Sequence, residues 1–419
     1  MIVETQEQFK QFKEKYEHLD SIIVPIFSDV NLHPLKNKLS LIYIKLIGGT
    51  DYILPFNHNE TVLDEPICSL DKLHSDTKKY TYDKKKLNHI VKLENVVDVN
   101  LIHYLDNGIP LDISELGTPI YNFYLSRLYN IKNLNESIPI LKHLEYCRKL
   151  AQLLRTEKSA PFQPYNDEAI DILTRLEHSG INFNNAIEYT EYNMFTSTGR
   201  PSSRFGGINF AALNKEDGSR KAITSRFDNG LLVEYDFDAF HPRLIADIIG
   251  YEFPKTSVHE YLGRQYKVGY NKSKAMTFRY LYGGIPYNIK KSIPFFGKVD
   301  EYIQELWREY KRNDFIKSYI YSKKIYKKNM DDMNANRLFN WGIQLLETET
   351  NWKMLSKLLP FLDGKKSKLI LYGYDSFLID IDRKNDGLHI IKEMKAIIEQ
   401  NGKYPTKIKF GKNYHEMKK

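Results

Sequence analysis

The sequence lacks the features that define secreted, disulfide-stabilised and membrane-spanning proteins. Only two of its 419 residues are cysteine, Cys68 and Cys147, too few for a disulfide framework and not spaced as metal ligands. No apolar run approaches bilayer-spanning length, and the N-terminal residues are charged too early for a secretory or transit signal. We expect a cytoplasmic protein with no membrane partner, in which both cysteines are packing residues.

Basic and aromatic residues are in excess. Lys and Arg total 61 against 53 for Asp and Glu, a formal charge of +8, and the chain has 30 Tyr and 22 Phe. A basic surface interleaved with rings suits a polyanion with stackable bases, although excess charge alone more often gives only a solvated surface. The length allows two or three domains, and no internal repeat or low-complexity tract is visible.

The hydrophobic pattern predicts three regions. Residues 1–135 are a mixed α/β domain that begins with a capping box at Thr5 and Gln8. Residues 136–190 are a helical connector, and residues 191–419 carry the candidate functional residues. Strands are predicted at 21–27, 39–47, 52–54, 231–236 and 406–410, and helices at 137–155, 167–180, 242–249, 271–283 and 388–400.

Two aspartates lie at predicted strand ends. Asp236 follows an apolar run and precedes a helix, and Asp375 joins two apolar runs in a hairpin pattern. Alone, such a carboxylate is more often a helix cap than a metal ligand. Two that meet across a sheet would suit two divalent ions about 4 Å apart, which activate an attacking oxygen and stabilise a leaving one in phosphoryl transfer.

Three further groups of polar residues have two interpretations each. Lys274, Phe278 and Tyr282 share one helical face; such an aromatic stripe is usually core, but a leading Lys suits a triphosphate, with the rings for base and sugar. Asn340 and Gln344 are surface polar residues or amides that reach a template strand. The stretch from Thr196 is an ordinary loop or a set of phosphate and minor-groove donors, comprising Thr196, Arg200, Ser202, Ser203, Arg204 and Asn209.

These motifs occur in an order that resembles the DNA polymerase I family, also called family A. TSTGRPSS resembles the family's T-x-x-G-R-x-S-S stretch, DFDAFHPR its motif A, KAMTFRYLYG its motif B and YDS at 374–376 its motif C. Asn340 and Gln344 stand where the family has Asn and Gln before motif C. Because chance matches would not keep both order and spacing, the resemblance is specific from about Leu173 to the C-terminus.

The resemblance implies an α+β fold: a right-hand polymerase with an antiparallel palm sheet, helical fingers at about 251–345 and a reduced thumb, preceded by an RNase H-like exonuclease-type domain. Asp236 and Asp375 would hold two Mg²⁺, or Mn²⁺ in their place, with the backbone carbonyl of Phe237; Lys274 would assist catalysis at the triphosphate. The implied nucleotide pocket is His241, His259, Lys274, Phe278 and Tyr282. The implied DNA contacts are Thr196, Arg200, Ser202, Ser203, Asn209, Asn340, Gln344 and Tyr374.

The sequence departs from the family pattern at several positions. His241 replaces the motif A Glu that excludes ribonucleotides, so we hypothesise sugar selection by His241 with Tyr282. Tyr270 stands where an Arg precedes the motif B Lys, and Lys272 or Arg264 are possible substitutes. The flanks of Asp375 are Tyr374 and Ser376 in place of His and Glu; neither flank is the primary ligand, so activity should survive.

The N-terminal domain resembles the family's 3′–5′ exonuclease domain more faintly. Asp83 matches the second exonuclease motif, but Ile26 and Ser28 stand where the first motif has acids, and the last motif is missing around Tyr121. One carboxylate is too few for a nuclease metal site, so we predict loss of proofreading. Asp29 would restore an acid under another alignment.

We therefore expect a compact DNA polymerase that extends primers with dNTPs on DNA templates, in the replication of a phage genome and hence in the host cytoplasm. A processivity factor, helicase or single-strand-binding protein is a further expected partner, because either helices 137–179 form the thumb or the grip on DNA is weak. The alternatives are a single-subunit RNA polymerase, a reverse transcriptase, and a non-catalytic nucleic-acid-binding protein.

Overall fold

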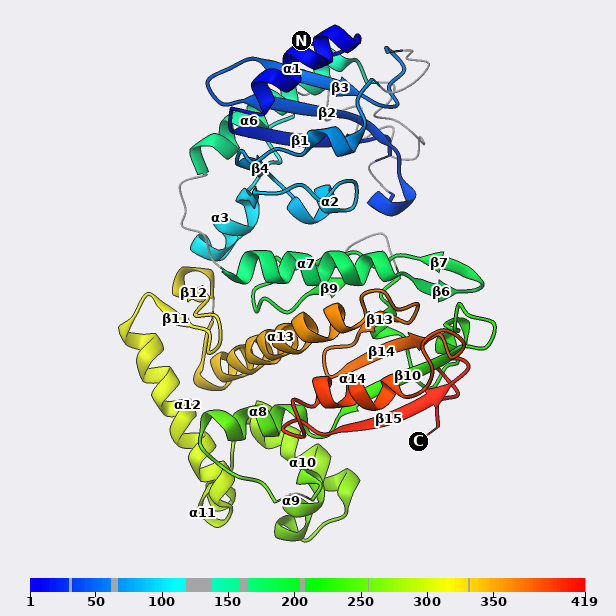
Figure 1. Ribbon diagram of the computed structural model, residues 1–419. Coiled ribbons are helices and arrows are strands. Elements are labelled where there is room, and N and C mark those ends of the chain that lie inside the picture. The colour runs from blue at the N-terminus through cyan, green and yellow to red at the C-terminus, as the bar shows by residue number, and fades with distance from the viewer. Residues whose placement is uncertain are drawn as a thin grey trace. The chain divides into compact units, whose positions relative to one another are not determined.

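The computed structural model describes residues 1–29, 32–61, 67–117, 138–157, 164–203, 208–254, 256–330 and 332–418. The chain forms two compact units, Met1–Thr174 and Arg175–Lys419 (Figure 1). No helix in these ranges is long and apolar enough to cross a membrane. The division into three regions expected from the sequence stays a prediction.

Unit 1 is built on a mixed five-stranded sheet in the order β3-β2-β1-β4-β5. Strands β1 to β3 are antiparallel neighbours, whereas β4 runs parallel to β1 and β5 parallel to β4. The strands are β1 Ser21–Phe27, β2 Leu39–Leu46, β3 Asp51–Pro55, β4 Lys79–Thr81 and β5 Val96–Asp98, and the helices α1 Gln6–Tyr16, α2 Lys84–Asn88, α3 Val99–Asn107 and α6 Ile140–Glu157.

Both faces of this sheet are buried, as the alternation along β1 requires. Ile23 packs into a core that includes Phe12 of α1, while Ile22 and Val24 pack into a second core that includes Leu150 of α6. Helix α6, which the sequence assigns to a separate connector, is therefore part of the core of unit 1. The free thiols of Cys68 and Cys147 are buried in these two cores, which confirms them as packing residues. The capping box at Thr5 is also confirmed.

Unit 2 is organised around a four-stranded antiparallel sheet in the order β13-β14-β10-β15 (Figure 1). Its strands are β10 Leu231–Phe237, β13 Lys368–Tyr372, β14 Ser376–Ile381 and β15 Thr406–Gly411. Three two-stranded ribbons pair β6 Ile181–Phe183 with β7 Ala186–Glu188, β8 Tyr192–Asn193 with β9 Ser202–Ser203, and β11 Phe315–Lys317 with β12 Lys324–Tyr326.

Helices cover one face of the unit 2 sheet. Trp352 of α13 packs on Tyr372 with ring centroids 5.8 Å apart, and the Tyr235 hydroxyl donates to the Ile391 carbonyl of α14 at 2.8 Å. Helix α7, Pro164–Ser179, contains the boundary along the chain between the two units, after Thr174. The remaining helices are α8 Phe240–Ile248, α9 Val258–Tyr266, α10 Tyr270–Gly283, α11 Tyr287–Ser292, α12 Pro294–Arg312, α13 Ala335–Phe361 and α14 Ile390–Ile398.

One predicted boundary is wrong in an instructive way. Helix α8 begins at Phe240, not at Pro242, because Ala239 takes a left-handed conformation with φ 55° that turns the chain directly out of β10. Pro242 then lies in the first turn, where a missing N–H costs no helical hydrogen bond. This turn brings His241 close to the end of β10.

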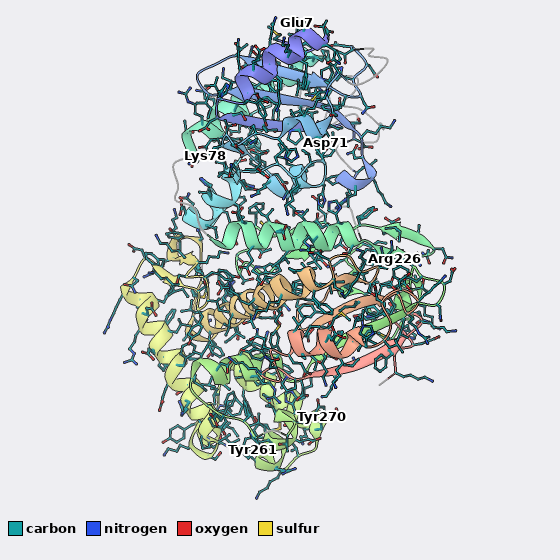
Figure 2. All side chains as sticks on the ribbon, in the orientation of Figure 1. Glu7, Asp71, Lys78, Arg226, Tyr261 and Tyr270 are labelled. Atoms are coloured by element: carbon teal, nitrogen blue, oxygen red, sulfur yellow. The ribbon has the colours of Figure 1, made fainter. Side chains whose placement is uncertain are left out.

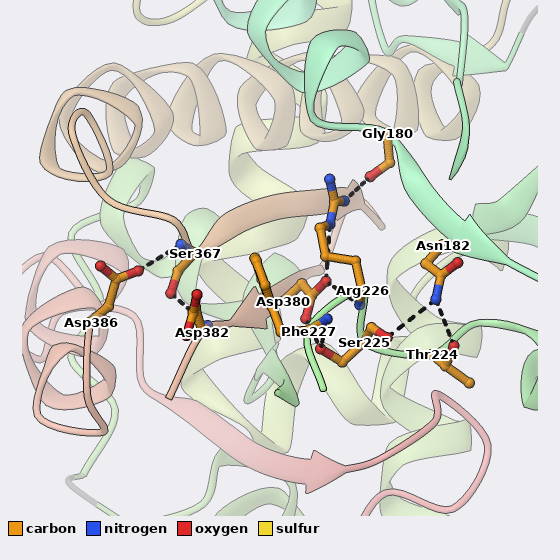
Figure 3. A network of polar contacts seen from close by, with 10 residues as sticks. All are labelled: Gly180, Asn182, Thr224, Ser225, Arg226, Phe227, Ser367, Asp380, Asp382 and Asp386. Carbon is orange, nitrogen blue, oxygen red and sulfur yellow. Dashed lines mark hydrogen bonds and ion pairs between the residues drawn. The ribbon is translucent and has the colours of Figure 1, made fainter. Parts of the chain in front are cut away.

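A buried polar network anchors the central strands of the sheet (Figure 3). Asp380, fully buried on β14, accepts hydrogen bonds from the Ser225 hydroxyl at 2.5 Å and from the Arg226 backbone N–H at 3.0 Å, and its Oδ2 lies 3.1 Å from Arg226 Nε. Arg226 also donates to the Gly180 carbonyl at 2.6 Å. The segment that leads into β10 is thereby fixed to β14, so β10, which carries Asp236, and β14, which Asp375 directly precedes, keep a set register.

Candidate active site

The two aspartates singled out by the sequence come together. Asp236 pairs with Ser376 in the β10–β14 register, and the Phe237 backbone N–H donates to the Asp375 carbonyl at 3.0 Å. Asp375 follows Tyr374, whose φ of 69° makes the tight turn between β13 and β14. Both carboxylates line a cleft of about 740 Å³.

The carboxylates differ in their electrostatic surroundings. Asp236 is part exposed and its Oδ2 lies 2.8 Å from Lys409 Nζ, which also pairs with Glu234 at 2.7 Å. Burial raises the pKa of Asp375, and the negative charges of Asp236 and Glu347 raise it further. No Lys or Arg forms an ion pair with Asp375 within the described ranges. A divalent cation between Asp236 and Asp375 would relieve this repulsion, so the donor set fits Mg²⁺.

The predicted stripe on α10 faces the cleft and not the core. Lys274, Phe278 and Tyr282 all line the cleft, whereas the core side of the helix is formed by Ser273, Thr277 and Leu281. The rings of Phe278 and Tyr282 are stacked, with centroids 5.8 Å apart and planes at 5°. Lys274 Nζ lies 5.9 Å from the Phe278 ring, which leaves its charge available to an anion.

His259 is a buried member of the same wall. Burial lowers its pKa to about 4, and nearby Lys274, Lys407 and Arg243 lower it against the opposing charge of Asp238. Its Nδ1 has no hydrogen-bond partner among the described residues. His259 lines the cleft together with Lys274 and Lys407, so an anionic ligand bound between these lysines would lie against its ring.

The low pKa of His259 predicts a pH effect on stability. The folded pKa lies below the unfolded value, so between pH 6.5 and about 4 the unfolded chain takes up a proton that the native chain does not. As the pH is lowered through this window, the free energy of unfolding should therefore fall by up to about 1.4 kcal/mol per pH unit. In His259→Phe this contribution is absent, so the free energy of unfolding should depend less steeply on pH than in wild type. Denaturation followed through tryptophan fluorescence measures both. An imidazole NMR signal of His259 that titrates near pH 6.5 would contradict the assignment.

Lys407 and Glu347 are two of the cleft residues that the sequence did not indicate. Lys407, on β15, donates to Asp238 Oδ1 at 2.6 Å and to the Tyr270 hydroxyl at 2.9 Å (Figure 2 labels Tyr270). Lys407 is therefore the cation beside Tyr270, while Lys272 and Arg264 do not line this cleft. Lys407 reaches the cleft because β15 pairs with β10, where Lys407 stands opposite Asp236, and the local sequence does not show this pairing.

Glu347 is the second residue that sequence reasoning missed. It is fully buried on α13 and lines the cleft, with Oε1 2.9 Å from His241 Nε2 and Oε2 3.2 Å from Arg200 Nη2. The available signal was an acidic residue in an apolar helical stretch, three positions after Gln344. An acid there requires buried partners.

The residues predicted to contact DNA are dispersed. Arg200 lines the cleft, with its guanidinium 3.8 Å from the centre of the Tyr374 ring. Asn340 donates to the Tyr282 carbonyl at 3.3 Å, whereas Asn209 is exposed and caps a short 3-10 turn. The side chain of Ser203 and all of Arg204 lie outside the described residues. Thr196, Ser202, Asn209, Asn340 and Gln344 do not line the cleft.

In unit 1, Asp83 has a structural role. Its carboxylate accepts from the Lys86 backbone N–H at 2.8 Å and caps α2, and Asp98 likewise caps α3 through the Leu101 N–H at 2.8 Å. Burial raises the pKa of Asp98 to about 7, and the charge of Asp83 raises it too. Asp29 is buried, and Tyr121 lies outside the described residues.

No family model matches the chain, and no curated protein matches it. Among solved structures it is similar to one described as the POL domain of Pol1 from M. smegmatis in complex with DNA primer-template and dNTP. The TM-score is 0.68 at 14% sequence identity, and the match covers 97% of each chain. The protein therefore has the fold of this polymerase domain along nearly its whole length; the order of its motifs predicts that fold from about Leu173 to the C-terminus. This likeness concerns the fold; the roles of individual residues stay predictions.

Proposed function

We propose that the protein is a template-directed DNA polymerase that adds dNMPs to a primer 3′ hydroxyl. The observation that carries the proposal is the placement of Asp236 beside Asp375 at one end of the two central strands of the palm-like sheet, in a cleft that Lys274 also lines. The structural neighbour was solved with primer-template DNA and dNTP, which supports the same partners here.

The residues that line the cleft would have two roles, metal binding and nucleotide binding. Asp236, Asp375 and the Phe237 carbonyl would hold two Mg²⁺, which supply activation of the 3′ oxygen and neutralisation of developing charge. Lys274 and His259 would contact the triphosphate and steady the pyrophosphate as it leaves. Phe278 and Tyr282 would form the face against which the base and sugar lie.

The finer assignments follow the sequence resemblance. They are membership of the DNA polymerase I family, a palm and fingers within residues 191–419, and a role in phage genome replication. Arg200 and Tyr374 are the DNA contacts that the cleft best supports, because they stack on each other beside Asp375. Unit 1 would be an RNase H-like domain without proofreading, since Asp83 is used as a helix cap.

Primer extension tests the proposal. Wild type with a labelled primer-template and Mg²⁺ should extend the primer with dNTPs. Extension with NTPs alone would favour an RNA polymerase, and extension on an RNA template alone a reverse transcriptase. Tight binding of primer-template without any extension would favour a non-catalytic binding protein and end the proposal.

A further inference from the structure

A continuous chain of polar contacts crosses the nucleotide side of the cleft. It starts at Arg200, passes through the buried carboxylate of Glu347 to His241 Nε2, and ends at the Tyr282 hydroxyl, which contacts His241 Nδ1. The four residues come from a loop and three different helices, and all four line the cleft. His241 is thus held at both ring nitrogens.

Glu347 determines the direction of the hydrogen bonds in this chain. The Glu347 carboxylate lies between the Arg200 guanidinium, which can only donate, and His241 Nε2, so we assign Nε2 as the donor to Glu347 Oε1. A neutral imidazole that donates at Nε2 accepts at Nδ1, and the Tyr282 hydroxyl donates to it. Burial raises the pKa of Tyr282, which keeps that proton in place. Glu347 therefore fixes both the tautomer and the orientation of His241.

Tyr282 is held on its other sides as well. Its ring stacks on Phe278, and its carbonyl accepts from Asn340 Nδ2 at 3.3 Å. His241 and Tyr282 together form one wall of the cleft, in which His241 Nδ1 and the Tyr282 hydroxyl are hydrogen-bonded to each other. A hydroxyl that enters this space must displace the bond between them, and His241 cannot turn away while Glu347 holds Nε2.

We infer that Glu347 is the positioning residue of a sugar-selecting wall, which keeps His241 and Tyr282 against the 2′ position of the incoming nucleotide and excludes a ribonucleotide. The inference rests on the proposed function, because it requires a nucleotide in the cleft. An amide at position 347 can either accept from Nε2 or donate to it, so it no longer fixes the tautomer of His241, and Nδ1 can then offer a proton to a 2′ hydroxyl instead of accepting from Tyr282.

The test is the ratio of kcat/KM for dCTP to that for CTP in single-nucleotide addition on one primer-template. Glu347→Gln should lower this ratio by at least about tenfold, mainly through a lower KM for CTP, since the loss of one such hydrogen-bonded contact changes discrimination by about 10- to 100-fold. His241→Ala should lower it to a similar extent. The double variant should fall no further than either single variant, because both act through one contact.

Glu349→Gln is the matched control. Glu349 is equally buried on α13, but it accepts from the Ile320 and Tyr321 backbone N–H groups and does not line the cleft. This variant should keep the wild-type ratio, although it also removes a buried charge. A ratio that falls equally in Glu349→Gln would show a general effect of destabilising α13 and would overturn the inference.

The remaining outcomes separate this inference from the proposed function. A wild type that adds dCMP, together with an unchanged ratio in Glu347→Gln, overturns the inference alone. A wild type that adds neither nucleotide overturns the proposed function. The ¹⁵N NMR spectrum of His241 is measured on wild type, so it does not depend on whether Glu347→Gln folds. It should show a protonated Nε2 and an unprotonated Nδ1. The opposite tautomer would overturn the inference.

Discussion

Replacing Asp375 by Asn should lower the rate of dNMP addition by at least about 10³-fold, equivalent to about 4 kcal/mol of lost transition-state stabilisation. The substitution keeps the size of the side chain and removes one of the two carboxylates that lie together where β10 ends and β14 begins. Single-turnover extension of a labelled primer with saturating dNTP and Mg²⁺ measures the effect.

The fold of Asp375→Asn should survive, which makes the activity loss interpretable. Because Asp375 lies next to the negative charges of Asp236 and Glu347, removing its charge should leave the melting temperature in EDTA equal to or above that of wild type. Asp228→Asn is the control, since this exposed residue lies in the loop before β10 and does not line the cleft. Because the substitution touches neither the core nor the cleft, the activity of Asp228→Asn should stay within about twofold of wild type. Full activity in Asp375→Asn would refute the assignment.

Arg226→Met should destabilise unit 2 by about 3–5 kcal/mol, the usual cost of leaving a buried charge without its partner. Asp380 is fully buried and keeps only the Ser225 hydroxyl and one backbone N–H when the guanidinium is removed (Figure 3). Denaturant unfolding followed by tryptophan fluorescence reports this unit specifically, because all three tryptophans of the chain, at 307, 341 and 352, lie in it.

Arg383→Met provides the comparison for Arg226→Met. Arg383 is exposed after β14 and, among the residues that the structure describes, contacts Asn229 at 3.5 Å, so its loss should change stability by less than about 0.5 kcal/mol. Equal effects of the two substitutions would show that the Arg226–Asp380 network does not hold the register of β10 and β14.

The sequence predicted best those elements whose signals are local. The capping box at Thr5, the strand that leads to Asp236 and the hairpin around Asp375 each depend on a few neighbouring residues, and the structure has them. The order of the motifs added information that no single motif holds. It led to the polymerase fold and to two aspartates that meet in space although they lie far apart in the chain.

The missed residues depend on contacts between distant elements. Lys407 enters the cleft only because β15 pairs with β10, and the sequence of β15 alone gives no reason to place it beside Tyr270. Glu347 acquires its partners from α8 and from the loop that carries Arg200. The packing of α6 into unit 1 was missed for the same reason, since an amphipathic helix does not show which sheet its apolar face covers.

The central claim is that Asp236 and Asp375 jointly bind the catalytic ions beneath an incoming nucleotide. Anomalous scattering from Mn²⁺ in crystals with dideoxy-terminated primer-template and the complementary dNTP tests it most directly. We expect two Mn²⁺ sites about 3.5–4 Å apart, both contacting these carboxylates, with the triphosphate towards Lys274. Nucleotide and metal bound elsewhere, or carboxylates that contact no ion in that complex, would contradict the account.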